Sequence, residues 1–269
     1  MNYEALFLER SGHIAILTLN RPEKLNALNN QLNRELHMAL DEVAGEFPDT
    51  RVLIITGTGR GFCSGADVGD QAEALSRSQK QGPPQYETEA AFNESILALG
   101  PHIPQIPQPV IAAVNGVAAG AGLSIALASD IRVASDKARF SCIFVKRSLV
   151  PDNGASYFLP ALAGMGVAAE MALTGRVYDA QWAHRVGLVN MVVPAEQLME
   201  EAKSLAQEIA ANPPLAVRAT KQLLTSHVPD LHRVARVEYE ANAPFRNGED
   251  RREAIISFLE KRQPVYTGR

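Results

Sequence analysis

Short apolar runs in the first half of the chain predict the strands of a central sheet. Residues 5–20 form two such runs joined by Ser11-Gly12-His13, which predicts two strands connected by a glycine-containing turn. The run at 51–57 is continuous, β-branched and ends at a glycine, as expected of a strand covered on both faces. Similar runs at 109–114 and 131–134, with helical stretches between them, indicate repeated β-β-α or β-α units.

Helices are predicted by apolar residues spaced three or four positions apart. One such stripe runs from Leu32 to Phe47 and predicts a helix that begins near Asn29. Helices dominate after about residue 160, and four of them are predicted at 195–211, 214–226, 229–246 and 249–261. We therefore divide the chain into a core domain, residues 1–195, and a C-terminal helical region, residues 196–269.

Two further segments have unusual composition. The stretch 103–129 carries no charge and is long enough to cross a bilayer. Prolines interrupt its start, and Asn115 and several glycines dilute its apolar character, so a buried strand–loop–helix unit is the better interpretation. Residues 76–90 are polar and contain Gly82-Pro83-Pro84, which predicts a loop beside a helix.

Composition excludes several classes of protein. The 269 residues are 46% hydrophobic and carry a net charge of −4, which fits one globular domain and gives no general attraction to nucleic acid or anionic membranes. Cys63 and Cys142 lack the spacing of a zinc site or a disulfide framework, so we expect buried free thiols and no metal. The N-terminal residues do not resemble a signal peptide, and a cytoplasmic location is expected.

Two glycine-rich loops follow predicted strands. Residues 61–68 come after the strand at 51–57, and residues 115–122 come after the strand at 109–114 and lead into an apolar helix. Small residues let the main chain approach a ligand, and amides at the start of a helix attract negative charge. Together the loops could form an oxyanion hole. The second loop lacks the third glycine of a dinucleotide-binding motif, which excludes that reading.

The sequence resembles the crotonase (enoyl-CoA hydratase/isomerase) family over nearly its whole length. Six segments in order carry the resemblance: residues 21–28, the Ser64-Gly65-Ala66-Asp67 loop, residues 115–122, Ser129-Asp130-Ile131, Gly187-Leu188-Val189-Asn190 and residues 258–262. The resemblance implies an α/β fold with a β-β-α spiral core and a C-terminal helical trimerisation region. It also implies a homotrimer or homohexamer, a coenzyme A thioester as substrate, no tightly bound cofactor and no metal.

The resemblance also assigns binding residues by motif position. The oxyanion donors would be the amides of Ala66 and Ala121. The coenzyme A moiety would be flanked by residues of two loops and approached by a C-terminal lysine: Glu23, Lys24, Leu25, Ala27, Ser64, Ala66, Asp67, Val68 and Lys261. Asp67 is also expected to fix its own loop by accepting main-chain hydrogen bonds. Lys261 has an equally good interpretation as an exposed helical lysine, and it could serve its own or a neighbouring subunit's site.

The sequence departs from the family's hydratases at the two catalytic acids. The positions of the two glutamates that position and deprotonate water in those enzymes are occupied by Ser124 and Phe144. Neither side chain can act alone as a general base near neutral pH, so hydration by two glutamates is not expected. Both residues are predicted to lie in the acyl pocket instead.

Asp152 is the best remaining acid, eight residues beyond Phe144. Relatives that shift double bonds, including dienoyl-CoA isomerases and 1,2-epoxyphenylacetyl-CoA isomerases, carry an aspartate at this spacing, and the latter group is especially similar here. An apolar pocket would raise the basicity of this carboxylate and suit it to moving a proton. The alternative is that Asp152 caps a helix beginning near Asn153. A dehalogenase relative uses such an aspartate as a nucleophile, but with a tryptophan at the position of Phe144.

The leading hypothesis is therefore an enoyl-CoA isomerase of fatty-acid or aromatic-acid degradation. In this hypothesis the amides of Ala66 and Ala121 hold the thioester oxygen while Asp152 relays the proton. The rival enzymes are a hydratase-like lyase or a C–C hydrolase with a different base. A rival of another class is a pseudoenzyme that binds acyl-CoA without turning it over. The acyl group is not specified by any of these motifs.

Overall fold

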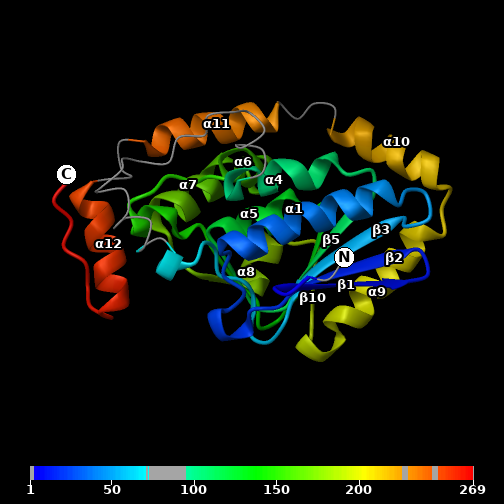
Figure 1. Ribbon diagram of the computed structural model, residues 1–269, viewed down its shortest axis with the longest axis horizontal. Coiled ribbons are helices and arrows are strands. Elements are labelled where there is room, and N and C mark those ends of the chain that lie inside the picture. The colour runs from blue at the N-terminus through cyan, green and yellow to red at the C-terminus, as the bar shows by residue number, and fades with distance from the viewer. Residues whose placement is uncertain (1–2, 71, 73–94, 226–229, 244–247, 269) are drawn as a thin grey trace.

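The computed structural model describes residues 3–70, 72, 95–225, 230–243 and 248–268, and it contains two β-sheets enclosed by helices (Figure 1). The predicted loop at 76–90 lies outside the described residues.

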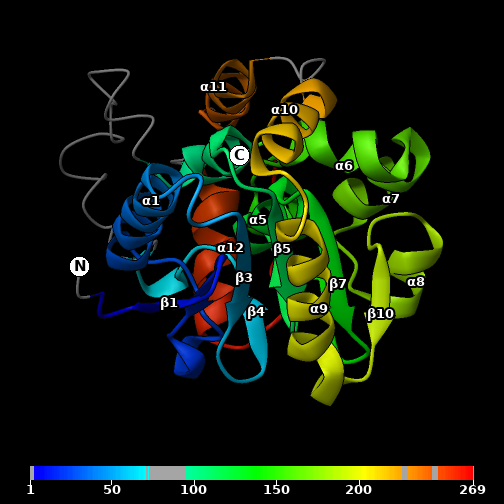
Figure 2. The ribbon, with the colours of Figure 1, turned by 90° about the vertical axis from the view of Figure 1, so that its right-hand side faces the viewer.

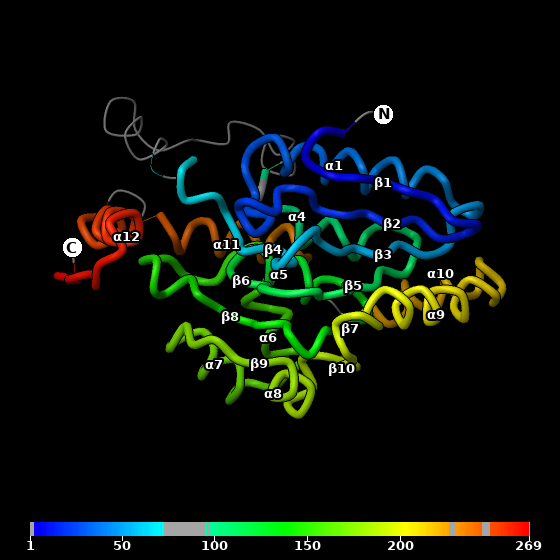
Figure 3. Tube along the Cα trace, turned by 90° about the horizontal axis from the view of Figure 1, so that it is seen from below, coloured from blue at the N-terminus to red at the C-terminus, as the bar shows by residue number. Residues whose placement is uncertain are grey.

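The larger sheet has six strands in the order β1-β2-β3-β5-β7-β10, which Figure 3 shows lying side by side. The strands are β1 (Leu6–Ser11), β2 (Ile14–Leu19), β3 (Val52–Gly57), β5 (Val110–Val114), β7 (Ile131–Ser135) and β10 (Met191–Val193). β1 and β2 form the predicted antiparallel hairpin, and every other neighbouring pair is parallel. The strands predicted from the apolar runs are confirmed.

A smaller sheet, which the hydrophobic pattern did not predict, has the strand order β4-β6-β8-β9. Its strands are β4 (Gly61–Cys63), β6 (Val117–Ala119), β8 (Arg139–Ser141) and β9 (Tyr178–Asp179). Both predicted glycine-rich loops therefore contain a short strand. The first three strands are parallel, and β9 is antiparallel to β8.

The helices have the following bounds: α1 (Asn30–Gly45), α4 (Leu99–His102), α5 (Ala121–Ala128), α6 (Ala155–Ala163), α7 (Met165–Thr174), α8 (Ala180–Arg185), α9 (Leu198–Ala210), α10 (Pro214–Thr225), α11 (Leu231–Asn242) and α12 (Glu249–Leu259). Short 3-10 helices include η1 (Pro22–Lys24) and η4 (Ile143–Arg147). Four C-terminal helices were predicted and are present, and α10, α11 and α12 follow one another along the outside of the molecule (Figure 1).

The chain winds as a β-β-α spiral. Each turn places one strand in the large sheet and the next in the small sheet, as in β5-β6-α5 and β7-β8-α6. Successive turns add their strands to the same side of both sheets, so the segments that follow β4, β6 and β8 gather in one region. The predicted crotonase-like architecture is thereby confirmed, and the segment 103–129 contains the expected buried strand and helix.

Alternate residues of the central strands face two separate cores. Leu53 and Ile55 of β3 point into the larger core, which α1, α5 and α6 complete. Ile54 of β3 and Ile111 of β5 point the other way, against the alanine-rich face of α9. Figure 2 shows α1 and α9 on opposite sides of the sheet. Burial on both faces explains why these strands are continuously apolar in sequence.

Helix α1 begins where predicted and ends earlier than its apolar stripe. The side chain of Asn29 accepts a hydrogen bond of 2.8 Å from the amide of Leu32, which caps the first turn. Phe47 lies beyond the last helical residue, Gly45, because Pro48 lacks the amide and restricts the residue before it.

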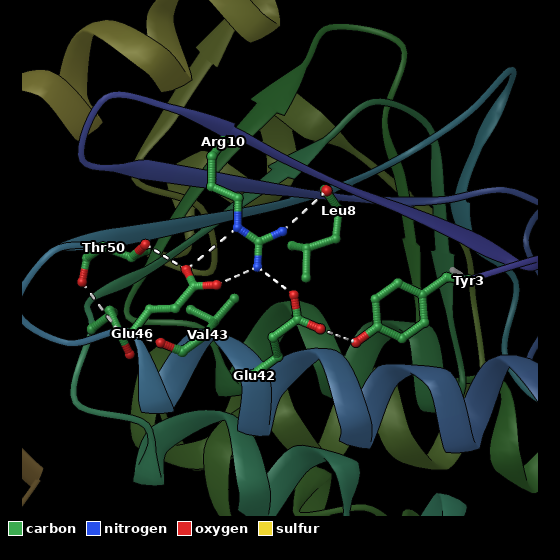
Figure 4. Close-up of polar contacts among 8 residues, drawn as sticks. Tyr3, Leu8, Arg10, Glu42, Val43, Glu46 and Thr50 are labelled. Carbon is green, nitrogen blue, oxygen red and sulfur yellow. Dashed lines mark hydrogen bonds and ion pairs between the residues drawn. The ribbon is translucent and has the colours of Figure 1, made fainter. Parts of the chain in front are cut away.

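Ion pairs attach α1 to the edge strand β1 (Figure 4). The guanidinium of Arg10 lies 2.6 Å from the carboxylate of Glu42 and also pairs with Glu46. Tyr3 donates a 2.8 Å hydrogen bond to Glu42. These contacts hold the helix that follows the 22–28 segment.

Among the described residues, no helix is both long and apolar enough to cross a membrane.

Candidate active site

The two glycine-rich loops meet because their strands are neighbours in the small sheet. β4 ends at Cys63 and β6 at Ala119, and Cys63 pairs with Ala118. Parallel strands end at the same edge of a sheet, where α/β proteins bind ligands. A Cβ atom placed on Gly65 would lie 3.5 Å from the main-chain nitrogen of Ala121 and only 2.8 Å from the carbonyl oxygen of Ala119. The loops are thus in direct main-chain proximity.

Glycine is required at both turns. Gly65 has φ +97° and Gly120 has φ +54°, a region that residues with a side chain seldom occupy. These conformations turn the chain out of β4 and into α5.

The main-chain amides of Ala66 and Ala121 have no acceptor within the described part of the chain. Leu28 bonds to the residues on both sides of Ala66: it donates 2.8 Å to the carbonyl of Gly65 and accepts 2.9 Å from the amide of Asp67. In such a parallel bridge the amide of Ala66 itself points away from Leu28. Ala121 is the first residue of α5, and amides of a first turn have no acceptor inside the helix.

Gly122 lets α5 approach β4 closely, and its replacement by alanine should destabilise the fold. A Cβ atom at this position would lie 2.0 Å from the carbonyl oxygen of Cys63. We expect Gly122→Ala to lower the free energy of unfolding by about 1–3 kcal/mol, the usual cost of overpacking. Denaturant unfolding measures this. Gly166 is the matched control, since it is also the second residue of its helix and its added Cβ meets nothing within 4 Å. Equal effects of the two alanines would contradict the steric explanation.

The 22–28 segment packs on the first loop. The amide of Ser64 donates to the carbonyl of Leu25 at 3.0 Å, and its hydroxyl donates to the carbonyl of Lys24 at 3.1 Å. Glu23 and Lys24 are exposed, Leu25 is partly buried and Ala27 is buried. The segments predicted to flank coenzyme A therefore form one continuous surface beside the free amide of Ala66.

Asp67 holds this surface together. Its carboxylate accepts 2.9 Å hydrogen bonds from the amide of Gly69 and from the guanidinium of Arg21, which also donates to the carbonyl of Ala27. Burial opposes ionisation of Asp67, but the hydrogen bonds from Arg21 and Gly69 outweigh it and lower the pKa. The predicted structural role of Asp67 is confirmed, whereas its partner Arg21 was not anticipated. Val68 is partly buried beside it.

Ser124, in the middle of α5, is bonded to the main chain at Asp152. Ser124 is fully buried, and its hydroxyl donates a 3.0 Å hydrogen bond to the main-chain carbonyl of Asp152. Phe144, in η4, is 4% exposed and belongs to the same apolar core as Ala121. The serine thus fixes the main chain at residue 152 and leaves its own hydroxyl engaged.

The carboxylate of Asp152 accepts no hydrogen bond from the described residues. Burial raises its pKa to about 8, the negative charge of Glu238 adds to this effect, and Arg251 acts in the opposite direction. Desolvation and a nearby like charge are the standard causes of a basic carboxylate. A group with this pKa can accept and return a proton near neutral pH.

The alternative that Asp152 caps the following helix is not supported by the structure. Helix α6 begins at Ala155, its N-cap is Gly154, and no side chain of the cap residue bonds to the first turn. The capping acceptor is instead the carboxylate of Glu238, which accepts from the amides of Gly154 at 2.8 Å and Ser156 at 2.9 Å. Sequence gave no signal for Glu238, because it lies in α11, far along the chain.

Lys261 does not join the other candidate residues within one chain. It is exposed immediately after α12, has φ 55°, and its amide donates to the carbonyl of Phe258 at 3.2 Å. No hydrogen bond or ion pair among the described residues connects it to the 22–28 segment. In the same described ranges, no group of three or more His, Cys, Asp or Glu could hold a metal ion. Cys63 and Cys142 are buried free thiols, as predicted.

Comparison with known proteins identifies the family of this chain. The sequence model of the enoyl-CoA hydratase/isomerase family matches residues 9–269. A probable enoyl-CoA hydratase of Rhodobacter capsulatus is 37% identical over 276 residues and covers 100% of both chains. The 1,2-epoxyphenylacetyl-CoA isomerase of Escherichia coli is 37% identical over 259 residues, covering 95% of each chain.

A crystal structure of an enoyl-CoA hydratase from Mycobacterium avium subsp. paratuberculosis superposes with a TM-score of 0.85 at 30% identity, covering 99% of this chain and 100% of that one. Matches of this extent in sequence and in structure show the family as well as the fold. The chain therefore belongs to the enoyl-CoA hydratase/isomerase, or crotonase, family, as an enzyme that processes acyl-CoA thioesters.

Proposed function

We propose that this enzyme is an enoyl-CoA isomerase that stabilises a thioester enolate and moves one proton between two carbons of the acyl chain. The observation that carries the proposal is Asp152, a carboxylate without a hydrogen-bond donor among the described residues and with a pKa of about 8. Its main chain is bonded to Ser124 of α5, the helix whose first residue is Ala121.

One base is enough for this reaction, because the proton removed from one carbon is returned to another. The amides of Ala66 and Ala121 both donate a hydrogen bond to the thioester carbonyl oxygen, and together they stabilise the negative charge that develops on it. Asp152 removes a proton from C2 of a 3-enoyl thioester, which forms the conjugated dienolate. The same carboxyl group then returns the proton to C4, and the product is the 2-enoyl thioester. No water is added and no group leaves.

Hydration is the second candidate, since several similar proteins, including the one from Rhodobacter capsulatus, are named hydratases. Its two-glutamate form needs a second acid. Ser124 has its hydroxyl bonded to the carbonyl of Asp152, and Phe144 carries no polar group. These residues favour isomerisation over hydration in the pocket.

Coenzyme A is proposed to lie along the 22–28 segment and residues 64–68, with its charged end near Lys24. Because Lys261 is exposed and no hydrogen bond or ion pair among the described residues joins it to this surface, we propose that it serves the site of a neighbouring subunit in a homotrimer or homohexamer. Helix α10 exposes two large apolar side chains, Leu223 (70% exposed) and Leu224 (75% exposed). Such exposed apolar surface supports an assembly of this kind. Light scattering measures the mass of the assembly.

Purified enzyme supplied separately with a 3-enoyl-CoA and a 2-enoyl-CoA tests the function. We expect absorbance of the conjugated thioester to appear from the first substrate. With the second substrate at the same enzyme concentration, we expect no loss of absorbance to a 3-hydroxyacyl product, which chromatography identifies. Rapid hydration of the 2-enoyl thioester would favour the hydratase, and tight binding of both thioesters without turnover would favour a pseudoenzyme.

A further inference from the structure

Helix α11 of the C-terminal region carries two buried polar side chains that face the loop of Asp152. Glu238 is 4% exposed and Asn242 is 5% exposed, and they lie one helical turn apart on the same side of α11. Burying such groups is costly unless they are hydrogen-bonded. Both are bonded to main-chain atoms of the segment 150–156.

The two side chains hold the segment on both sides of Asp152. Asn242 accepts a 3.0 Å hydrogen bond from the amide of Val150, two residues before the aspartate. Glu238 accepts from the amide of Gly154, two residues after it, at 2.8 Å. Its second oxygen bonds the amide of Ser156 at 2.9 Å, so one carboxylate fixes the turn and the start of α6. A negative charge is favoured at this end of a helix.

Two further contacts complete the support from the core side. The hydroxyl of Ser124 holds the carbonyl of Asp152 at 3.0 Å, and the side chain of Asn153 accepts from the amide of Gly100 at 2.6 Å. Asn153 has φ 59°, a left-handed conformation that residues with a side chain seldom adopt, and the bond to Gly100 helps to hold it there. The main chain around residue 152 is therefore held from α5 on one side and from α11 on the other.

We propose that Glu238 is a positioning residue for the reaction, which orients Asp152 toward the acyl chain and, with Asn242, makes turnover depend on α11. The inference rests on the proposed function. Glu238 itself does not touch substrate, because both of its oxygens are bonded to main-chain amides. Its charge has a second effect: with burial, it disfavours ionisation of Asp152, whereas Arg251 of α12 favours it.

The variants Glu238→Gln and Asn242→Ala separate the positioning of Asp152 from the effect of the Glu238 charge on its ionisation. The glutamine keeps the size of the side chain, loses the charge and replaces one acceptor oxygen by a donor. We expect kcat for isomerisation to fall about 10- to 100-fold, the range for a displaced catalytic group, with KM changed less. The acid limb of the pH profile should also move to lower pH. Asn242→Ala should lower kcat without shifting the midpoint of the acid limb, because it removes no charge. Glu240→Gln, an exposed change on the same helix, is the control.

A readout that is independent of turnover separates this inference from the proposed function. In protein labelled with ¹³C-aspartate, the carboxyl carbon of Asp152, assigned with Asp152→Asn, can be titrated by NMR. We expect its midpoint to fall in Glu238→Gln and to stay unchanged in Glu240→Gln. An unchanged midpoint, together with unchanged kcat in folded Glu238→Gln, would leave Glu238 a purely structural cap. If the NMR midpoint moves but Asp152→Asn isomerises normally, the proposed function fails. The influence of Glu238 on the ionisation of Asp152 would then still stand.

Discussion

Replacing Asp152 with asparagine is expected to reduce kcat for 3-enoyl-CoA isomerisation by about 100- to 10,000-fold, the usual contribution of a positioned general acid–base group. Asparagine has the same shape but cannot accept the proton from C2 at neutral pH. Steady-state absorbance assays at saturating substrate measure the loss. Asp49→Asn, an exposed aspartate outside the site, should leave the rate unchanged.

The same variant should fold at least as well as the natural enzyme. Burial raises the pKa of Asp152 to about 8, above the ordinary value of 3.8. Between these values the folded state holds a proton that the unfolded state releases, so this group makes the fold less stable as pH rises from about 4 to 8. Asparagine removes this effect, and Tm at pH 8 should be equal or higher. A large loss of Tm alongside the lost activity would point to misfolding instead of a missing base.

The pH profile gives the same prediction a second readout. A general base must be ionised in the free enzyme, so kcat/KM should rise with pH and level off above about 8, the pKa of Asp152. The limb should be absent from the residual activity of Asp152→Asn. Full activity down to pH 5 would show that another group removes the proton.

Ala121→Pro is expected to lower kcat/KM by about 100- to 1,000-fold, the cost of removing one oxyanion donor. Proline has no amide proton, and its fixed φ suits the first position of a helix, which is where Ala121 lies. The preceding residue is Gly120, at ψ −128°, which does not obstruct a following proline. The variant should therefore keep α5 while losing the donor.

Met165→Pro is the matched control, since Met165 is also the first residue of a helix, follows a glycine with positive φ, and is 73% exposed. It should isomerise normally. Circular dichroism and thermal unfolding of both variants separate loss of a donor from loss of structure. A folded Ala121→Pro enzyme with normal kcat/KM would exclude this amide from the oxyanion hole.

Much of the fold could be predicted because burial leaves a direct pattern in sequence. Ile54 and Leu53 of β3 face two different cores, so the strand is apolar at every position. The small sheet was missed because its strands have two or three residues, too few for any period to be visible. The apolar stripe overran α1 by including Phe47, where Pro48 already prevents a further turn.

The site was predictable where it is local and not where it depends on distant residues. Glycines at 65 and 120 follow strands directly, and their conformations are a property of the loops themselves. Glu238 and Arg21 show nothing in their own neighbourhoods that identifies a partner, because only the fold brings them to Gly154 and Asp67. The alternative that Asp152 caps its own helix is not supported for the same reason: a carboxylate from α11 already occupies that role.

Exchange of the C2 protons of a saturated acyl-CoA, such as butyryl-CoA, with D2O tests most directly that two amides and one carboxylate together form the enolate. This thioester has no double bond to shift or hydrate, so proton NMR at C2 reports enolate formation alone. We expect the natural enzyme to catalyse exchange, with a large loss in Asp152→Asn and in Ala121→Pro and none in Met165→Pro. Exchange that is undiminished in both site variants would contradict the proposed arrangement.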